Sequence, residues 1–209
     1  MNEIFFLTEP QFQILVWLSY RIAATFAFGL PLFLLIWAKI SNSSSIRRLL
    51  SIYWKVSSLY AINLLFLSSE SQLGQLISFI APILMVASIW FWFDLNQEID
   101  DMPDYKPIAL TTRIWRWNLS FWSILNTGLH IFSWKCLNSI NGDFCNTWRE
   151  IPYNSFMTTK IIIKFVLDGN WSTGFATFFG YLALILYLIG VLQWLIIQLP
   201  KNGRFAGKF

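Results

Sequence analysis

The densest group of charged side chains follows an aromatic run, in the segment SIWFWFDLNQEIDDMP. It contains Asp94, Glu98, Asp100 and Asp101, and Asp104 comes directly after it. Carboxylate oxygens are the ligands that Mg²⁺ and Ca²⁺ prefer, but the spacing matches no calcium-binding loop, so no metal is assigned. Two interpretations stay open: an ion-pair cluster that fixes helix packing, which we favour, and a site for a ligand, lipid or partner.

Basic residues are placed to meet these carboxylates. If the apolar segments on either side of a short connection at 68–72 form an antiparallel hairpin, Asp94 lies level with Arg47 and Arg48. Arg113 and Arg116 begin the next apolar segment at the same end. The sequence therefore predicts that four arginines surround the acidic run.

Cys136 and Cys145 are the two cysteines of the chain. An Asn-Gly-Asp turn between them favours a disulfide. The alternatives are free thiols, a redox-active pair, or a metal site with His130 as a third ligand, for which the sequence supplies no CxxC or HxxxH spacing.

Polar or ionisable residues also occur within the apolar segments: Arg21, Lys55, Asn63, Asn126 and His130. Arg21 and Lys55 lie close enough to segment ends to extend their charged groups toward the membrane surface. Asn126 and His130 are one turn apart, and with Asn118 they predict a polar stripe for hydrogen bonding between helices. A single histidine excludes a paired-histidine haem site, and we expect no cofactor.

No catalytic motif occurs in the sequence. It contains no GxSxG, HExxH or phosphate-binding loop. We therefore expect a protein that is not an enzyme.

The elements that must position these residues are apolar helices. Hydrophobic residues make up 56% of the 209 residues and charged residues only 12%, which is about half the usual charge of a soluble domain. Segments of about 20 apolar residues are long enough to cross a bilayer. We predict an all-α integral membrane protein of one domain, 1–209, with about five spans at 16–38, 49–67, 73–95, 114–134 and 175–199. Pro31 predicts a kink in the first, and 135–173 is the longest connection.

The orientation follows from the Lys and Arg residues beside the spans. One side holds nine: Lys39, Arg47, Arg48, Lys106, Arg113, Arg116, Lys201, Arg204 and Lys208. The other holds four: Lys135, Arg149, Lys160 and Lys164. Cytoplasmic loops are enriched in positive charge, so we predict the N-terminus outside and the C-terminus in the cytoplasm. Both cysteines then lie outside, where disulfides persist. We read the basic residues as topology signals and expect no nucleic-acid partner.

Several motifs resemble a family of membrane proteins known as domain of unknown function three-one-seven-seven. They are Trp17, Leu18, Tyr20 and Arg21, the segments RRLLSIYWKVSSL at 47–59 and SIWFWFDLNQEIDDMP at 88–103, the cysteine loop with Trp148, and Gly203-Arg204. The resemblance implies a cyanobacterial origin, a thylakoid or plasma membrane, and a cysteine loop in the lumen or periplasm. It brings no activity and no site residues.

The leading functional hypothesis is an accessory protein that stabilises or helps to assemble a larger photosynthetic or respiratory membrane complex. Its expected partners are the lipid bilayer and a membrane-protein complex, and no oligomeric state is assigned. One alternative is a small carrier with a polar path through Lys55, Asn63 and Asp94 and helix breaks at Pro31 and Pro82. The other is a protein that binds a pigment or quinone through its Trp-rich surfaces.

Overall fold

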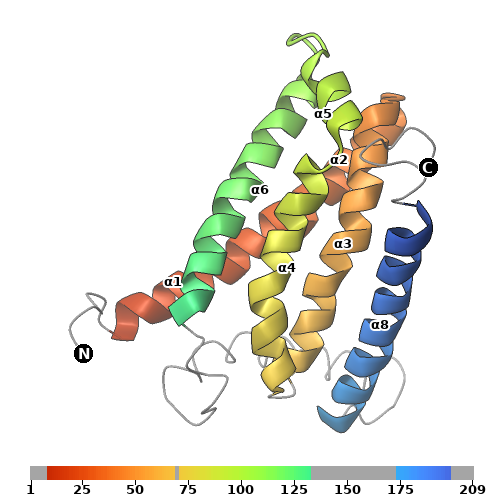
Figure 1. Ribbon diagram of the computed structural model, residues 1–209. Helices are drawn as coiled ribbons and strands as arrows, with labels where there is room; N and C mark the ends of the chain where they lie inside the picture. Colours follow the sequence, from red (N-terminus) through yellow and green to blue (C-terminus); the bar gives the residue numbers. More distant parts are fainter. Residues whose placement is uncertain (1–8, 69–70, 133–172, 199–209) are drawn as a thin grey trace, which may run out of the picture.

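The computed structural model describes residues 9–68, 71–132 and 173–198, and within them every element is helical (Figure 1). The elements are α1 (Glu9–Ile22), η1 (Ala23–Gly29), α2 (Leu30–Ile40), α3 (Ser44–Ser68), α4 (Gln72–Trp90), α5 (Phe93–Asp100), α6 (Pro107–Phe132), α8 (Thr173–Gln193) and η3 (Trp194–Gln198). Because α1, η1 and α2 are continuous, as are α8 and η3, the described residues form six helices.

Four of these helices are long and apolar enough to cross a membrane: Ile14–Ile40, Ser44–Leu67, Leu73–Trp90 and Gly174–Ile197. They coincide with four of the predicted spans, which confirms a multipass integral membrane protein. The fourth predicted span, 114–134, overlaps α6 from Ile114 to Phe132, the last residue that the structure describes there.

The first helix contains a π-helical segment, η1, in the turns before Pro31. Proline has no N–H and its ring displaces the carbonyl four residues earlier, which is that of Ala27. The Tyr53 hydroxyl on α3 donates to the Ala27 carbonyl at 2.7 Å, and the Trp115 indole on α6 donates to the Phe26 carbonyl at 2.9 Å. The turns before Pro31 thus form a π-helix whose carbonyls accept hydrogen bonds from side chains of two neighbouring helices, and the kink at Pro31 stays a prediction.

The second and third spans form the predicted antiparallel hairpin of α3 and α4. The two helices approach closely at the connection, where a Cβ atom on Gly74 would lie 2.9 Å from the backbone nitrogen of Leu67. Further along the hairpin, Asn63 donates to the Ser78 hydroxyl at 2.6 Å. The small residue and the buried hydrogen bond together fix the alignment of α3 and α4.

The third predicted span, 73–95, is wrong at its end. The helix stops at Trp90, Trp92 is extended with φ −86° and ψ 98°, and the separate helix α5 follows. The Asn96 amide of α5 folds back and donates to the carbonyls of Ile89 at 3.0 Å and Trp92 at 2.8 Å. The side chain thus satisfies the Ile89 carbonyl in the last turn of α4, and it adds a second donor to the Trp92 carbonyl, which also accepts the backbone N–H of Asn96 at 3.1 Å.

Helix α6 has a polar inner face and an apolar outer face. Its buried polar residues are Thr112, Arg116, Ser120, Ser123, Asn126 and His130. Its most exposed residues are apolar: Ile114, Trp117, Phe121, Ile124, Leu125 and Ile131. At 26 residues, about 39 Å, it is long enough to cross a bilayer, and its inward polar residues lower its overall apolarity.

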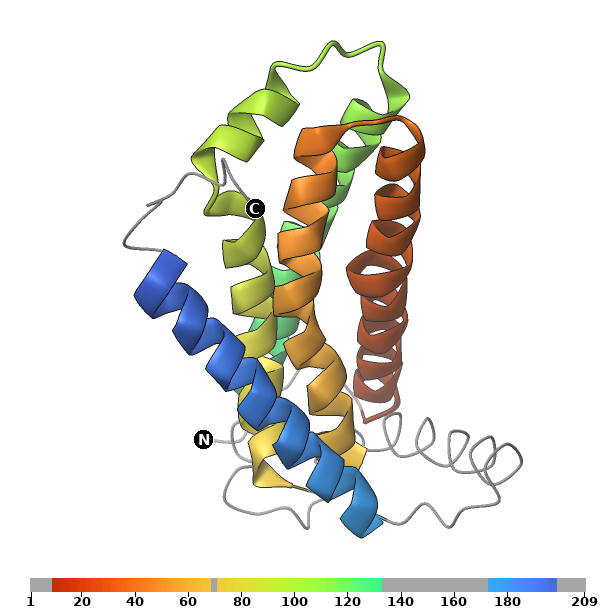
Figure 2. The ribbon, with the colours of Figure 1, turned by 90° about the vertical axis from the view of Figure 1, so that its right-hand side faces the viewer.

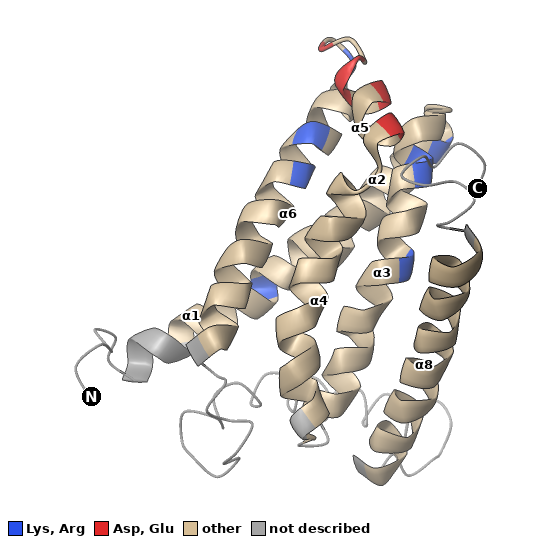
Figure 3. Ribbon diagram, in the orientation of Figure 1, with Lys and Arg blue, Asp and Glu red and all other residues tan. Residues whose placement is uncertain are grey.

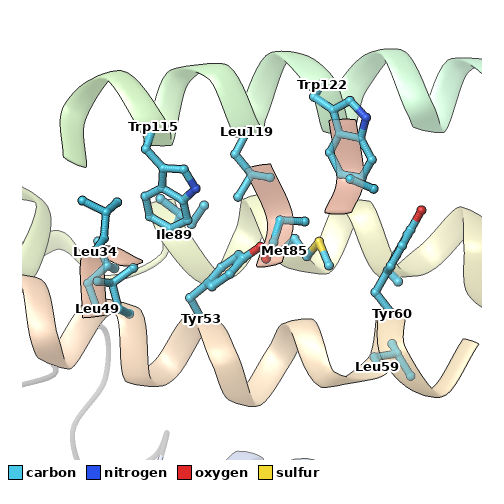
Figure 4. Close-up of a cluster of buried hydrophobic side chains, with 14 of the residues drawn as sticks. Leu34, Leu49, Tyr53, Leu59, Tyr60, Met85, Ile89, Trp115, Leu119 and Trp122 are labelled. Carbon is cyan, nitrogen blue, oxygen red and sulfur yellow. Dashed lines mark hydrogen bonds between the residues drawn. The ribbon is translucent and has the colours of Figure 1, made fainter. Parts of the chain in front are cut away.

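The helices α2, α3, α4 and α6 surround one apolar core, which Figure 4 shows between α3, α4 and α6. Tyr53 and Trp115 meet there edge to face, with ring centroids 5.1 Å apart. Helix α8 lies outside this group against α3 (Figure 2), where Tyr181 packs edge to face on Phe66 at 5.1 Å. Most of α8 is exposed and apolar, as expected for a helix that faces lipid.

Candidate functional site

Most of the charged residues that the structure describes lie at one end of the bundle, as the coloured ribbon in Figure 3 shows. We call this the charged end and the opposite one the far end. Helices α2, α4, α5 and η3 finish at the charged end, and α3 and α6 begin there. The described residues at this end include five carboxylates, Asp94, Glu98, Asp100, Asp101 and Asp104, and six cations, Lys39, Arg47, Arg48, Lys106, Arg113 and Arg116.

Arg113 of α6 caps the C-terminal end of α5. Its guanidinium donates to the carbonyls of Ile99 at 2.9 Å, Asp100 at 2.7 Å and Met102 at 2.5 Å, and it also pairs with the Asp104 carboxylate. The last carbonyls of a helix have no helical partners and carry partial negative charge, so a cation is stabilising there. One arginine thus joins the end of α5 to the following loop.

Arg116, one turn further along α6, holds the side of α5. It pairs with the Asp100 carboxylate, donates to the side-chain Oδ1 of Asn96 at 2.5 Å and lies over the Trp90 ring, 5.1 Å from its centroid. Arg116 is only 1% exposed, whereas the Asp100 side chain is 56% exposed. The buried charge therefore has a partner that stays in contact with water.

A third contact joins α5 to the start of α3. Glu98 accepts a hydrogen bond from Ser45 and pairs with Arg48 at 3.3 Å. The sequence placed Asp94 level with Arg48. The carboxylate found against Arg48 is one turn later, because the break after Trp90 turns the chain into the separate helix α5.

The other predicted residues of the charged end differ in their exposure. Arg47, Asp101 and Asp104 are exposed, and Asp94 is half-buried in the first turn of α5. Within the described parts of the chain, no group of His, Cys, Asp and Glu side chains has an arrangement that would hold a metal ion. The geometry holds α5 in place through ion pairs and helix capping.

The predicted intramembrane residues divide into two groups. Arg21 is exposed and lies over the Trp17 ring at 5.2 Å, and Lys55 is exposed on α3. Asn63, Asn126 and His130 are buried. Cys136 and Cys145 lie outside the described residues.

The predicted polar stripe of α6 needs one correction. Asn118 is exposed and donates to the carbonyl of its own helix at Ile114. Eight residues separate it from Asn126, which at 100° per residue places the two about 80° apart around the helix. Ser123, one turn before Asn126, is buried together with Asn126 and His130.

Two residues of the charged end were missed in the sequence. Asn96 and Ser45 each contact a helix other than their own, and their residue types alone gave no sign of it. For Asn96, the sequence has no proline or glycine between α4 and α5 that would have indicated the helix break beside it.

A family model described as "Protein of unknown function (DUF3177)" matches residues 13–207. No curated protein and no solved structure matches the chain.

Proposed function

The chain belongs to the DUF3177 family, and we propose that it is a non-enzymatic accessory protein that stabilises or helps to assemble a larger membrane complex. The partner would bind at the charged end. This proposal includes five crossing helices, with α6 among them, and a cytoplasmic charged end, in accord with the excess of Lys and Arg there. The proposed complex is a photosynthetic or respiratory one in a cyanobacterial thylakoid or plasma membrane.

The observation that carries the proposal is the fixed position of α5. A helix of eight residues is too short to be stable alone. Arg113, Arg116 and Asn96 nevertheless attach it to α4 and α6. A rigid element loses little conformational freedom when a partner binds, which favours association.

The outward surface of α5 and its following loop is suited to protein contact. Phe93, the first residue of α5, is 58% exposed, and Tyr105 in the loop after α5 is 82% exposed; Asp101 and Asp104 of the same loop are also exposed. Aromatic residues are enriched at the centres of protein interfaces, and charged residues at the rim give specificity. We call this surface, formed by these four residues, the α5 platform.

The experiment compares the α5 platform with a lipid-facing surface of the same chain. A tagged protein is isolated from gently solubilised membranes, sized on native gels, and its bound subunits are measured by quantitative mass spectrometry. We expect a complex with stoichiometric subunits for the unchanged protein. The double variant Phe93→Ala, Tyr105→Ala should retain at least about tenfold less of these subunits than the unchanged protein, since interface aromatics carry much of the binding energy.

The matched control is Phe178→Ala, which removes an exposed aromatic ring from α8. It should keep the bound subunits, and both variants should reach the membrane in equal amount. A free monomer for the unchanged protein, or equal retention by the double variant, would contradict the proposal.

The carrier alternative draws less support. Its three polar residues do not share a path, because Lys55 is exposed on α3, Asn63 is bonded to Ser78 inside the hairpin, and Asp94 lies on α5.

A further inference from the structure

The interior of the bundle toward the far end contains a second polar group, which lies away from the α5 platform. It consists of Trp122, Ser123 and Asn126 on α6, and we call it the donor cluster. Trp122 is 5% exposed and Ser123 and Asn126 are each 1% exposed. The three residues are separated by one, three and four positions, so they form a continuous patch on one side of the helix.

Each member of the donor cluster has a hydrogen-bond donor without a partner. Within the described residues, the Trp122 indole nitrogen, the Ser123 hydroxyl and the Asn126 amide nitrogen make no hydrogen bond. The Asn126 carbonyl does accept from Ser19 on α1 at 2.6 Å, which fixes the orientation of the side chain. Buried polar atoms in proteins nearly always have partners, and three such atoms together are unusual.

Aromatic side chains border the cluster. The Tyr60 ring on α3 meets Trp122 at 6.1 Å and an interplanar angle of 72°, and Phe28 meets Tyr60 at 6.1 Å. In Figure 4 the Tyr60 side chain extends from α3 across the core toward α6, with its hydroxyl on the side of Trp122. A tyrosine hydroxyl of α3 and aromatic rings of two other helices therefore lie beside the donor cluster of α6.

We propose that the donor cluster binds the carbonyl oxygen of a flat apolar molecule of the quinone class. Indole N–H, hydroxyl and amide N–H groups can all donate to a carbonyl oxygen. The bordering rings can pack against a flat ring in offset or edge-to-face arrangement. A quinone also dissolves in the hydrocarbon of a bilayer, from which it can reach a site between helices without crossing water.

The proposal does not depend on the accessory function. The donor cluster is formed by α6 with α1 and α3 bordering it, whereas the proposed partner contacts α5 and the following loop. A variant that loses quinone binding can therefore still be tested for partner binding, and the reverse also holds.

The test measures retention of a decyl-substituted benzoquinone by the purified full-length protein in dodecyl maltoside. The tagged protein is equilibrated with increasing quinone, separated, extracted with organic solvent and analysed by chromatography. We expect saturable binding near one quinone per chain. Asn126→Leu and Trp122→Phe should each raise the dissociation constant about five- to tenfold, since each removes one donor.

The matched control is Asn118→Leu, which makes the same substitution on the exposed side of the same helix. It should leave the dissociation constant unchanged. Thermal unfolding in the same detergent checks that each variant is folded. If Asn126→Leu does not fold, Trp122→Phe still tests the cluster, because it keeps an aromatic ring in the core. Absence of saturable binding would overturn the proposal and would assign the donors to internal water. An equal rise in the dissociation constant for Asn118→Leu and for the cluster variants would also overturn it.

Discussion

Removal of the Arg116 side chain tests whether this residue holds α5 on the bundle. Methionine is an unbranched apolar replacement that keeps part of the volume, so Arg116→Met removes the pair with Asp100, the hydrogen bond to Asn96 and the contact with Trp90. A hydrogen bond to a charged group contributes about 1.5–3 kcal/mol. Two such bonds, to Asp100 and Asn96, and a cation–π contact of about 0.5–2 kcal/mol together contribute about 3.5–8 kcal/mol.

Two effects reduce this sum. The variant no longer buries a guanidinium, which relieves a desolvation penalty of several kcal/mol. Asp100 is half exposed and regains water when its partner is removed. A net loss of about 2 kcal/mol in the local stability of α5 remains, and at about 1.4 kcal/mol per factor of ten this corresponds to a roughly 30-fold change in the opening equilibrium.

Hydrogen–deuterium exchange in lipid nanodiscs measures this opening directly, because amide exchange follows local unfolding. The amides of α5 should exchange roughly 30-fold faster in Arg116→Met. Arg47→Met is the control, since Arg47 is exposed at the same end of the bundle, and it should change α5 exchange less than about twofold. Unchanged α5 exchange in Arg116→Met, or an equal effect of Arg47→Met, would refute the reasoning.

Two further predictions concern helix packing and are measured as free energies of unfolding by SDS titration in dodecyl maltoside. Tyr53→Phe should lower the stability by about 1–3 kcal/mol, because the Ala27 carbonyl freed by the π-helical segment loses its donor; an unchanged stability would mean that the carbonyl finds another partner. Gly74→Ala should lower it by about 1–3 kcal/mol, because the added Cβ would lie 2.9 Å from the Leu67 nitrogen. Gly128→Ala is its control, has no atom within 4 Å of the added Cβ and should be neutral or stabilising by up to about 1 kcal/mol; a loss equal to that of Gly74→Ala would exclude the steric explanation.

The sequence predicted the long apolar helices well because the lipid environment acts on every residue of a span. Runs of apolar residues identified four spans. Most of the predicted span ends lie within two residues of the ends in the structure. The hairpin of α3 and α4 followed from a connection too short for any other arrangement. These features depend on composition and length, which are properties of one segment at a time.

The break between α4 and α5 was not predicted, because no proline or glycine marks it. It depends on Asn96, whose side chain bonds back to Ile89 and Trp92, and on Arg113, which caps α5 from another helix. Contacts of this kind arise only after the helices pack. The charges at this end could be grouped from the sequence, but their individual partners could not be assigned without the break.

The polar inner face of α6 has a consequence for how the chain enters a membrane during synthesis. A segment moves from the translocon into lipid when its apolar side chains outweigh its polar ones, and an arginine weighs strongly against that step. The helices that supply partners for α6, including Ser19 on α1 and Trp90 on α4, are all made before it. We therefore expect α6 to insert against helices already in place, whereas the uncharged α8 carries enough apolar surface to enter lipid independently.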